Sequence, residues 1–163
     1  MKKFTALLLI LSTLFLLGCQ SAEPNGVTFY YSRQPDQFQY FQEDGVISSE
    51  IRDLAGHRND LRYMVGLYLA GPMEEGLALP FPKTIRLINV TQTNNTITVE
   101  LSGHTNILND SEFTLGCTCL ALTCMDFTSC SEVTVTSGAR TLTLDKDSIL
   151  LFDSLQQQEH NGG

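Results

Sequence analysis

Four cysteines that lie close together are the first residues of this chain whose chemistry needs an explanation. Their spacing is C-x-C-x₄-C-x₅-C, and they are Cys117, Cys119, Cys124 and Cys130. Structural zinc sites usually pair their cysteines as two C-x₂₋₄-C units, which this spacing does not do. Cys117 and Cys124 fall on one apolar face of a predicted helix, where a thiol behaves as a small hydrophobic side chain. We therefore predict no metal site and interpret these two residues as core thiols.

A disulfide among the remaining cysteines stays open. Cys117 and Cys119 cannot bridge to one another within one helix without distortion. Cys130 lies just beyond the predicted helix and could reach back to Cys124 or Cys119, and an exported location would permit the oxidation. The sequence does not decide between free thiols and a disulfide that uses two of Cys119, Cys124 and Cys130.

No other group of residues has the spacing of a catalytic site. The three histidines are dispersed, at His57, His104 and His160. Ser102 and His104 could be read as a nucleophile and its base, but they have neither a glycine-elbow signature nor a third member. The carboxylate pairs Glu74–Glu75 and Asp145/Asp147 lie in turn-like stretches that are typical of solvated surface. We predict no catalytic residue and no cofactor, and we expect a protein that is not an enzyme.

The fifth cysteine, Cys19, has a different setting. Met1–Cys19 begins with two lysines and continues with an apolar run, which are the marks of a secretory signal. The run is short for a bilayer span, and its end, Leu16–Cys19, resembles the lipobox of bacterial lipoprotein precursors. That resemblance implies cleavage after residue 18 and lipidation of the Cys19 sulfur, with palmitate among the acyl groups. Several acyl chains anchor a protein stably, so we expect a lipoprotein on the extracytoplasmic side of the cell membrane.

The charge of the chain limits the partners that it could bind. The formal net charge is −8, and loss of the two positive charges of Lys2 and Lys3 with the signal would make it −10. Nucleic acid binding needs clustered Lys and Arg, so we expect no nucleic acid partner. The chain has no tryptophan, which weakens the case for an aromatic platform that stacks on carbohydrate.

Strand and helix patterns alternate along the mature sequence. The expected elements, in order, are strands 27–31 and 46–54, a helix over 61–69, strands 84–91 and 96–101, a helix over 110–127, and strands 132–136 and 141–144. In the strand 46–54, Ile51 and Leu54 are the expected apolar contacts. Gly71-Pro72 should end the first helix, and Asn109 with Glu112 is a plausible capping signal for the second.

This alternation predicts an α+β fold, with two helices packed on one face of a mixed or antiparallel sheet. The expected organisation is a lipoprotein signal over residues 1–18, a tether over 19–26, one domain over 27–153 and a disordered tail over 154–163.

The central stretch also carries a family resemblance. Its segments are Leu67–Pro72, Gly76–Pro80, Thr84-Ile85 and Val99–Ser102. In order and spacing they resemble the GerMN domain, a sporulation and spore-germination module of bacterial cell-envelope proteins. Glu100 stands where that family prefers Asp, and Phe81-Pro82 stands where it usually has Pro-x-Gly-Thr. The resemblance extends over about residues 27 to 152, and it implies a fold like that of ring-building motifs.

The resemblance implies a non-catalytic module that assembles with an envelope protein of unknown identity or lies near peptidoglycan, in sporulation or spore germination, and that could form oligomers. The alternative is an envelope hydrolase acting on peptidoglycan, which would need a clustered acid, base or metal site. A solute-binding lipoprotein is disfavoured, because a single domain lacks a two-lobed cleft. Any binding residues of the central stretch should lie in its exposed parts, Met73–Gly76 and the turn Gln92–Asn95.

Overall fold

The computed structural model describes residues 26–34 and 45–149 of the 163-residue chain. The predicted signal, the lipobox cysteine Cys19 and the predicted tail lie outside the described residues. Within the described part, no helix combines the length and the apolar character that crossing a membrane requires.

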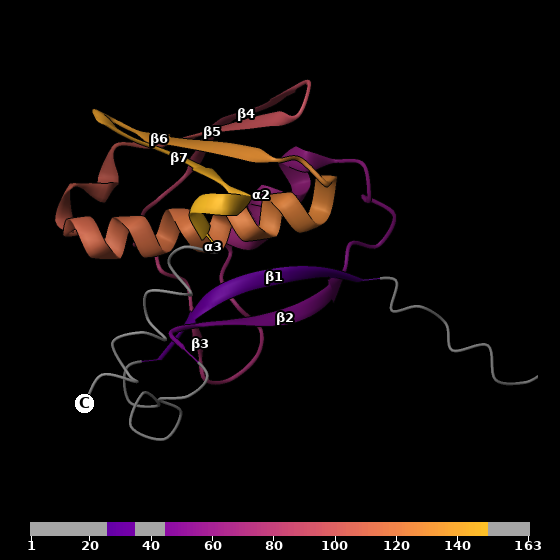
Figure 1. Cartoon of the computed structure of the whole chain (residues 1–163). Coiled ribbons are helices and arrows are strands. Elements are labelled where there is room, and N and C mark those ends of the chain that lie inside the picture. Colours follow the sequence, from indigo (N-terminus) through magenta and orange to yellow (C-terminus); the bar gives the residue numbers. More distant parts are fainter. Residues whose placement is uncertain (1–25, 35–44, 150–163) are drawn as a thin grey trace, which may run out of the picture.

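The strands form two sheets, which lie on either side of the helices (Figure 1). The first sheet has the order β2-β1-β3 and is antiparallel, with β1 at Gly26–Arg33, β2 at Ile47–Asp53 and β3 at Leu77–Ala78. The second has the order β4-β5-β6-β7, and its strands are Leu87–Thr93, Thr96–Leu101, Glu132–Ser137 and Arg140–Asp145. Its central pair, β5 and β6, is parallel, and the outer pairs are antiparallel.

Capping side chains set where the helices begin. The α2 helix, Leu61–Leu69, starts after Asp60, whose carboxylate accepts the backbone N–H of Tyr63 at 2.9 Å. A short 3₁₀ helix, η2, occupies His104–Ile107. The α3 helix, Asp110–Thr128, starts with the predicted capping box, in which Asn109 and Glu112 each accept the other's backbone N–H at 2.9 Å.

The ends of the elements follow from backbone chemistry in the same way. Gly71 follows α2 with φ +96°, a left-handed conformation that suits glycine, so the predicted stop is confirmed. The strand predicted from residue 84 begins only at Leu87. The N–H of Ile85 bonds to the carbonyl of Pro82 at 2.9 Å, which holds this segment in a turn and places the Ile85 side chain in the core.

The α3 helix is buried on two opposite sides. The predicted apolar face, which includes Cys117 and Cys124, is buried, but so are Cys119 and Met125, which lie outside that face. A helix that is apolar all round requires covering layers on more than one side. The α+β class, the two main helices and the mixed or antiparallel pairing are therefore confirmed, but the helices lie between two sheets and not on one face of a single sheet.

The α3 helix also covers part of an edge of the first sheet. The backbone N–H of Thr28 donates to the Asp126 carboxylate at 3.0 Å, and that of Tyr30 donates to the Thr123 hydroxyl at 2.9 Å. Thr123 in turn donates to the carbonyl of Cys119 at 2.9 Å. The short strand β3 pairs only with Ser32 and Arg33 of β1. Side chains of α3 thus accept backbone N–H groups of β1 that β3 does not reach.

Candidate functional site

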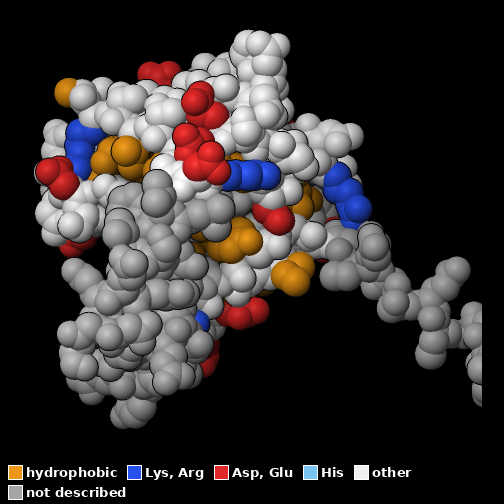
Figure 2. Space-filling model, viewed as in Figure 1, with side chains coloured by type: hydrophobic (Ala, Val, Ile, Leu, Met, Phe, Trp, Pro, Cys, Tyr) orange, Lys and Arg blue, Asp and Glu red, His pale blue; other side chains and the backbone are white. Residues whose placement is uncertain are grey.

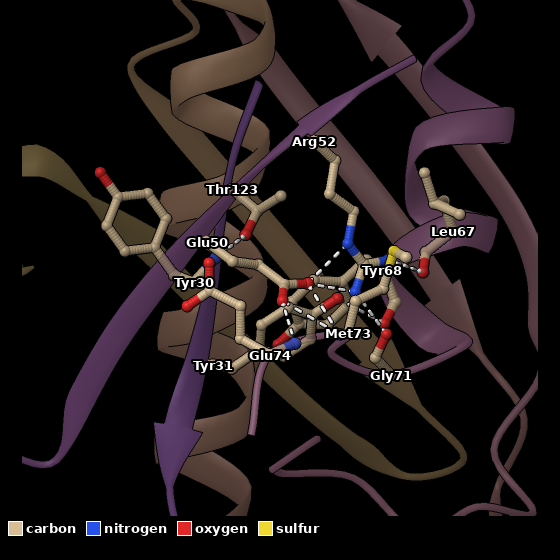
Figure 3. Close-up of polar contacts among 10 residues, drawn as sticks. All are labelled: Tyr30, Tyr31, Glu50, Arg52, Leu67, Tyr68, Gly71, Met73, Glu74 and Thr123. Atoms are coloured by element: carbon tan, nitrogen blue, oxygen red, sulfur yellow. Dashed lines mark hydrogen bonds and ion pairs between the residues drawn. The ribbon is translucent and has the colours of Figure 1, made fainter. Parts of the chain in front are cut away.

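A buried ion pair lies beneath the loop that follows α2 (Figure 3). Glu50 and Arg52 are two residues apart in β2, so their side chains point to the same side of the sheet. The side chains form a salt bridge in which Arg52 Nε donates to Glu50 Oε1 at 2.5 Å. Glu50 is only 3% exposed and Arg52 only 7%. Burying two charges in this way is costly unless further hydrogen bonds satisfy both groups.

Backbone groups of the loop provide those hydrogen bonds. The Glu50 carboxylate accepts the N–H of Met73 at 3.0 Å and that of Glu74 at 2.8 Å. The Arg52 guanidinium donates to the carbonyl of Gly71 at 2.6 Å and to that of Leu67 at 3.3 Å. The pair therefore bonds both to the end of α2 and to the segment after it, which fixes the first half of Gly71–Gly76. We call Gly71–Gly76 the anchored loop.

Aromatic side chains complete the support under this loop. The guanidinium of Arg52 lies 5.1 Å from the ring centre of Phe29 and 5.6 Å from that of Tyr31, close enough for cation–π attraction. Tyr31 stacks on Tyr68 with ring centres 4.9 Å apart, and its hydroxyl donates to the Tyr68 carbonyl at 3.2 Å. Burial raises the pKa of both tyrosines above the usual range, so both are neutral phenols.

The anchored loop presents an apolar side chain between acidic ones. Met73 is 81% exposed, more than any other large hydrophobic residue of the described chain. Glu74 and Glu75 follow it, and both are exposed. An adaptable apolar side chain on a fixed backbone, next to carboxylates, suits contact with a protein surface that offers an apolar recess and basic neighbours.

The second predicted surface segment, Gln92–Asn95, is exposed as well and is held at its end. Asn95 donates from its side chain to the Ser131 hydroxyl at 2.7 Å and accepts the Ser131 N–H on its carbonyl at 3.1 Å. These bonds tie the β4–β5 turn to the connection between α3 and β6.

Ser102 and His104 do meet, but in an open loop. The hydroxyl of Ser102 lies 3.1 Å from Nδ1 of His104 and accepts the backbone N–H of Arg86 at 3.0 Å. No described carboxylate hydrogen-bonds the His104 ring, so the third member of a triad is missing from the described residues. His57 stacks on Tyr63 instead, and His160 lies outside the described residues.

The four clustered cysteines are buried free thiols in this structure. Burial raises the pKa of Cys117 to about 12 and those of Cys119 and Cys124 further. The thiolate is the reactive form, so these groups are inert as nucleophiles. The core position predicted for Cys117 and Cys124 is confirmed, and among the described residues no three His, Cys, Asp or Glu side chains are placed to hold a metal. The disulfide alternative stays a prediction.

The predicted carboxylate pairs lie on the surface. Glu74, Glu75, Asp145 and Asp147 are all exposed. Asp145 has a local role, because the hydroxyl and the backbone N–H of Ser148 donate to its carboxylate and lower its pKa.

Sequence reasoning missed Glu50 and Arg52. Ile51 was expected to be an apolar contact, but it is 60% exposed and its two charged neighbours are the buried residues. A strand alternates its sides, so burying Ile51 would have placed both charges outward. The available signal was the spacing of two opposite charges at i and i+2, which lets them pair on one side of a strand.

Comparisons with known proteins give no family assignment. No family model matches the sequence, and no curated protein matches it. Among solved structures, the fold is similar to that of a candidate lipoprotein from Clostridium perfringens, with 14% identity and a TM-score of 0.47 over 75% of this chain and 87% of that chain. At this identity and score the likeness carries no argument about function.

Proposed function

We propose that this chain is a lipid-anchored, non-catalytic module of the cell envelope that binds a protein partner through the anchored loop. The lipobox that ends at Cys19 supports the membrane anchor. The observation that carries the binding role is Met73, an apolar side chain that is 81% exposed on a backbone held by the buried Glu50–Arg52 pair.

The rigidity of the anchored loop favours a binding role, which the exposure of Met73 alone would not do. A segment that is already ordered loses less conformational entropy when a partner docks, so more of the contact energy appears as affinity. Mobile surface loops do not usually donate two backbone N–H hydrogen bonds to a buried carboxylate. Glu74 and Glu75 next to Met73 favour a partner with basic residues around an apolar recess.

The residues of the described chain favour this role over a peptidoglycan hydrolase. A hydrolase would need an acid, a base or a metal site in one place. The nucleophile–base contact between Ser102 and His104 has no described carboxylate partner, and the clustered thiols are buried.

The resemblance of residues 67–102 to the GerMN domain supports sporulation or spore germination as the setting of this role. Gly71 and Ile85 of that stretch also have structural roles, since one ends α2 and the other fills the core.

Photo-crosslinking in the intact host cell tests the binding role. A photoreactive amino acid at position 73 of the full-length chain should give a discrete protein adduct. The matched control is the same substitution at Ile107, which is 78% exposed and lies in η2. Adducts that are identical at the two positions, or adducts with peptidoglycan fragments alone, would contradict a protein-binding loop.

A further inference from the structure

The two sheets have four edges, and three of these are protected within the described residues. Natural sheets protect edges with charges, with short strands or with covering elements, because an open edge pairs with other strands. The β2 edge carries the inward-pointing Glu50 and Arg52. The β3 edge is two residues long. The β7 edge begins with Arg140 and ends with Asp145, and Arg140 is itself bonded to the loop before α3.

The fourth edge, β4, is less protected within the described residues, where Arg62 of α2 reaches it near its start. Its sequence, Leu-Ile-Asn-Val-Thr-Gln-Thr, contains no charged residue and no proline. Its irregularity in register lies between Leu87 and Asn89, at the start of the strand, and leaves the rest regular. Figure 1 shows β4 at the outer side of its sheet, away from β1, β2 and β3. Five of its seven residues are exposed.

Backbone directions show which groups of this edge are open. The carbonyl of Asn95, just before β5, points toward β6, because it accepts N–H groups at the start of β6. The N–H of Ser102, just after β5, points toward β4, because it donates to the carbonyl of Arg86, just before β4. Directions alternate along a strand, so Thr98 of β5 points its backbone groups to β4, where its partner is Thr91. The backbone N–H and carbonyl groups of Val90 and Gln92 must then point outward.

Little covers those outward groups within the described chain. Arg62 reaches the carbonyl of Ile88 at 3.5 Å, near the start of β4. Among the described residues, β5 is the strand that pairs with β4, and the hydrogen bonds from other segments do not reach the outward groups of Val90 or Gln92.

A row of threonines ends at this edge. The register aligns one threonine from each strand across the outer face of the second sheet, namely Thr91, Thr98, Thr134 and Thr143. The hydroxyls of Thr134 and Thr143 are 2.9 Å apart, as expected for neighbours in such a row. Thr–Thr pairs across strands are favourable, and Thr91 has such a neighbour on one side alone.

We propose that two copies of this chain associate through β4, in antiparallel pairing about a twofold axis at Thr91. The four-stranded sheet would then continue into a sheet of eight strands. Val90 of each copy would bond to Gln92 of the other, which satisfies the outward groups, and Thr91 would lie opposite Thr91 of the second copy. A twofold contact of this kind closes on itself and does not lead to filaments.

The absence of charge in β4 favours a second copy as the occupant. The chain carries a net charge of −8, so most of its surface would place carboxylates opposite carboxylates on self-association. Pairing through β4 avoids that, because neither strand carries a charge. Pairing through β4 would occur in the purified chain, whether or not the anchored loop binds a partner.

Cysteine crosslinking tests the pairing directly. At a non-hydrogen-bonded antiparallel position the two Cα atoms lie ~4.5 Å apart, which is within the range of a disulfide. The full-length chain with Thr91→Cys, in detergent with oxidised glutathione, should form a dimer on non-reducing gels. Thr98→Cys is the matched control on the same face, since its two copies would be three strand spacings apart, or ~14 Å. The Thr98→Cys variant and the unmodified chain should form no covalent dimer and should run as monomers on the gel.

A second substitution separates edge pairing from other contacts. Gln92→Pro removes an outward N–H, which an edge strand tolerates, so it should abolish the Thr91→Cys dimer while the chain keeps a cooperative thermal unfolding transition. Crosslinking that is equal at Thr98→Cys, or that survives Gln92→Pro, overturns the proposal. So does a monomeric unmodified chain in analytical ultracentrifugation, or, in cells, a Thr91→Cys adduct with a different protein, which would identify a foreign strand as the occupant.

Discussion

Replacing Glu50 with alanine is expected to weaken the fold and to release the anchored loop at the same time. The substitution leaves the Arg52 guanidinium, 7% exposed, without its carboxylate. It also removes the acceptor of the Met73 and Glu74 N–H groups, which lie 3.0 and 2.8 Å from Oε2. One perturbation therefore acts on a buried charge and on the backbone of the loop.

The magnitude follows from how deeply the pair is buried. Removing one partner of a buried ion pair costs about 3–5 kcal/mol, because the other charge is left uncompensated. For a domain of this size, that corresponds to a fall in the thermal midpoint of roughly 10–20 °C. Replacing both charged residues by apolar ones, as Glu50→Leu with Arg52→Met, should recover most of the stability, since apolar replacement of a buried pair is often neutral. The loop N–H groups would still lack their acceptor.

Two measurements separate these effects. Urea unfolding followed by circular dichroism gives the free energy of unfolding for each variant. Amide hydrogen exchange at Met73 and Glu74 reports the loop, and it should be fast in both the single and the double variant. The matched control is Glu100→Ala, an exposed carboxylate in β5 with an expected change of about 0.5 kcal/mol or less.

The result that would refute this reasoning is specific. A loss of unfolding free energy below about 1 kcal/mol for Glu50→Ala would mean that the charge of Arg52 is compensated by other groups when Glu50 is removed. Unchanged exchange at Met73 and Glu74 would mean that the carboxylate does not hold the loop, and it would remove the main support for the proposed binding role.

Four further predictions concern the cysteines and the anchor. Alkylation of the denatured mature protein should modify four thiols in the 117–130 segment, and two fewer would establish a disulfide. In the native protein at pH 8, the four thiols should not react with Ellman's reagent, because all four are buried. Burial also raises the pKa of Cys117 to about 12 and those of Cys119 and Cys124 further. A raised folded-state pKa gives stability that is fully present below the unfolded pKa, here 9.0, and is lost as pH rises toward the folded value. Urea midpoints should therefore be level up to about pH 8 and fall from pH 9 to 11, and a flat profile would contradict the buried thiols. Incorporation of labelled palmitate should be lost in Cys19→Ala, and retained label would exclude the lipobox assignment.

Local chemistry made several elements readable from the sequence alone. The span of α2 follows from its apolar stripe, and its end follows from Gly71, which takes φ +96°. The start of α3 follows from the reciprocal capping of Asn109 and Glu112. Such features involve residues within a few positions of one another, so the chain determines them without knowledge of the rest of the fold.

The tertiary structure decided what depends on distant partners. A second sheet covers the far side of α3, which is why Cys119 and Met125 are buried when a single sheet would have left them exposed. Glu50 could be placed inside because the loop after α2, more than 20 residues along the chain, supplies its N–H donors. The open edge of β4 exists because the topology places that strand last in its sheet. Each of these facts depends on which segments meet in space, and hydrophobic periodicity within one segment does not contain that information.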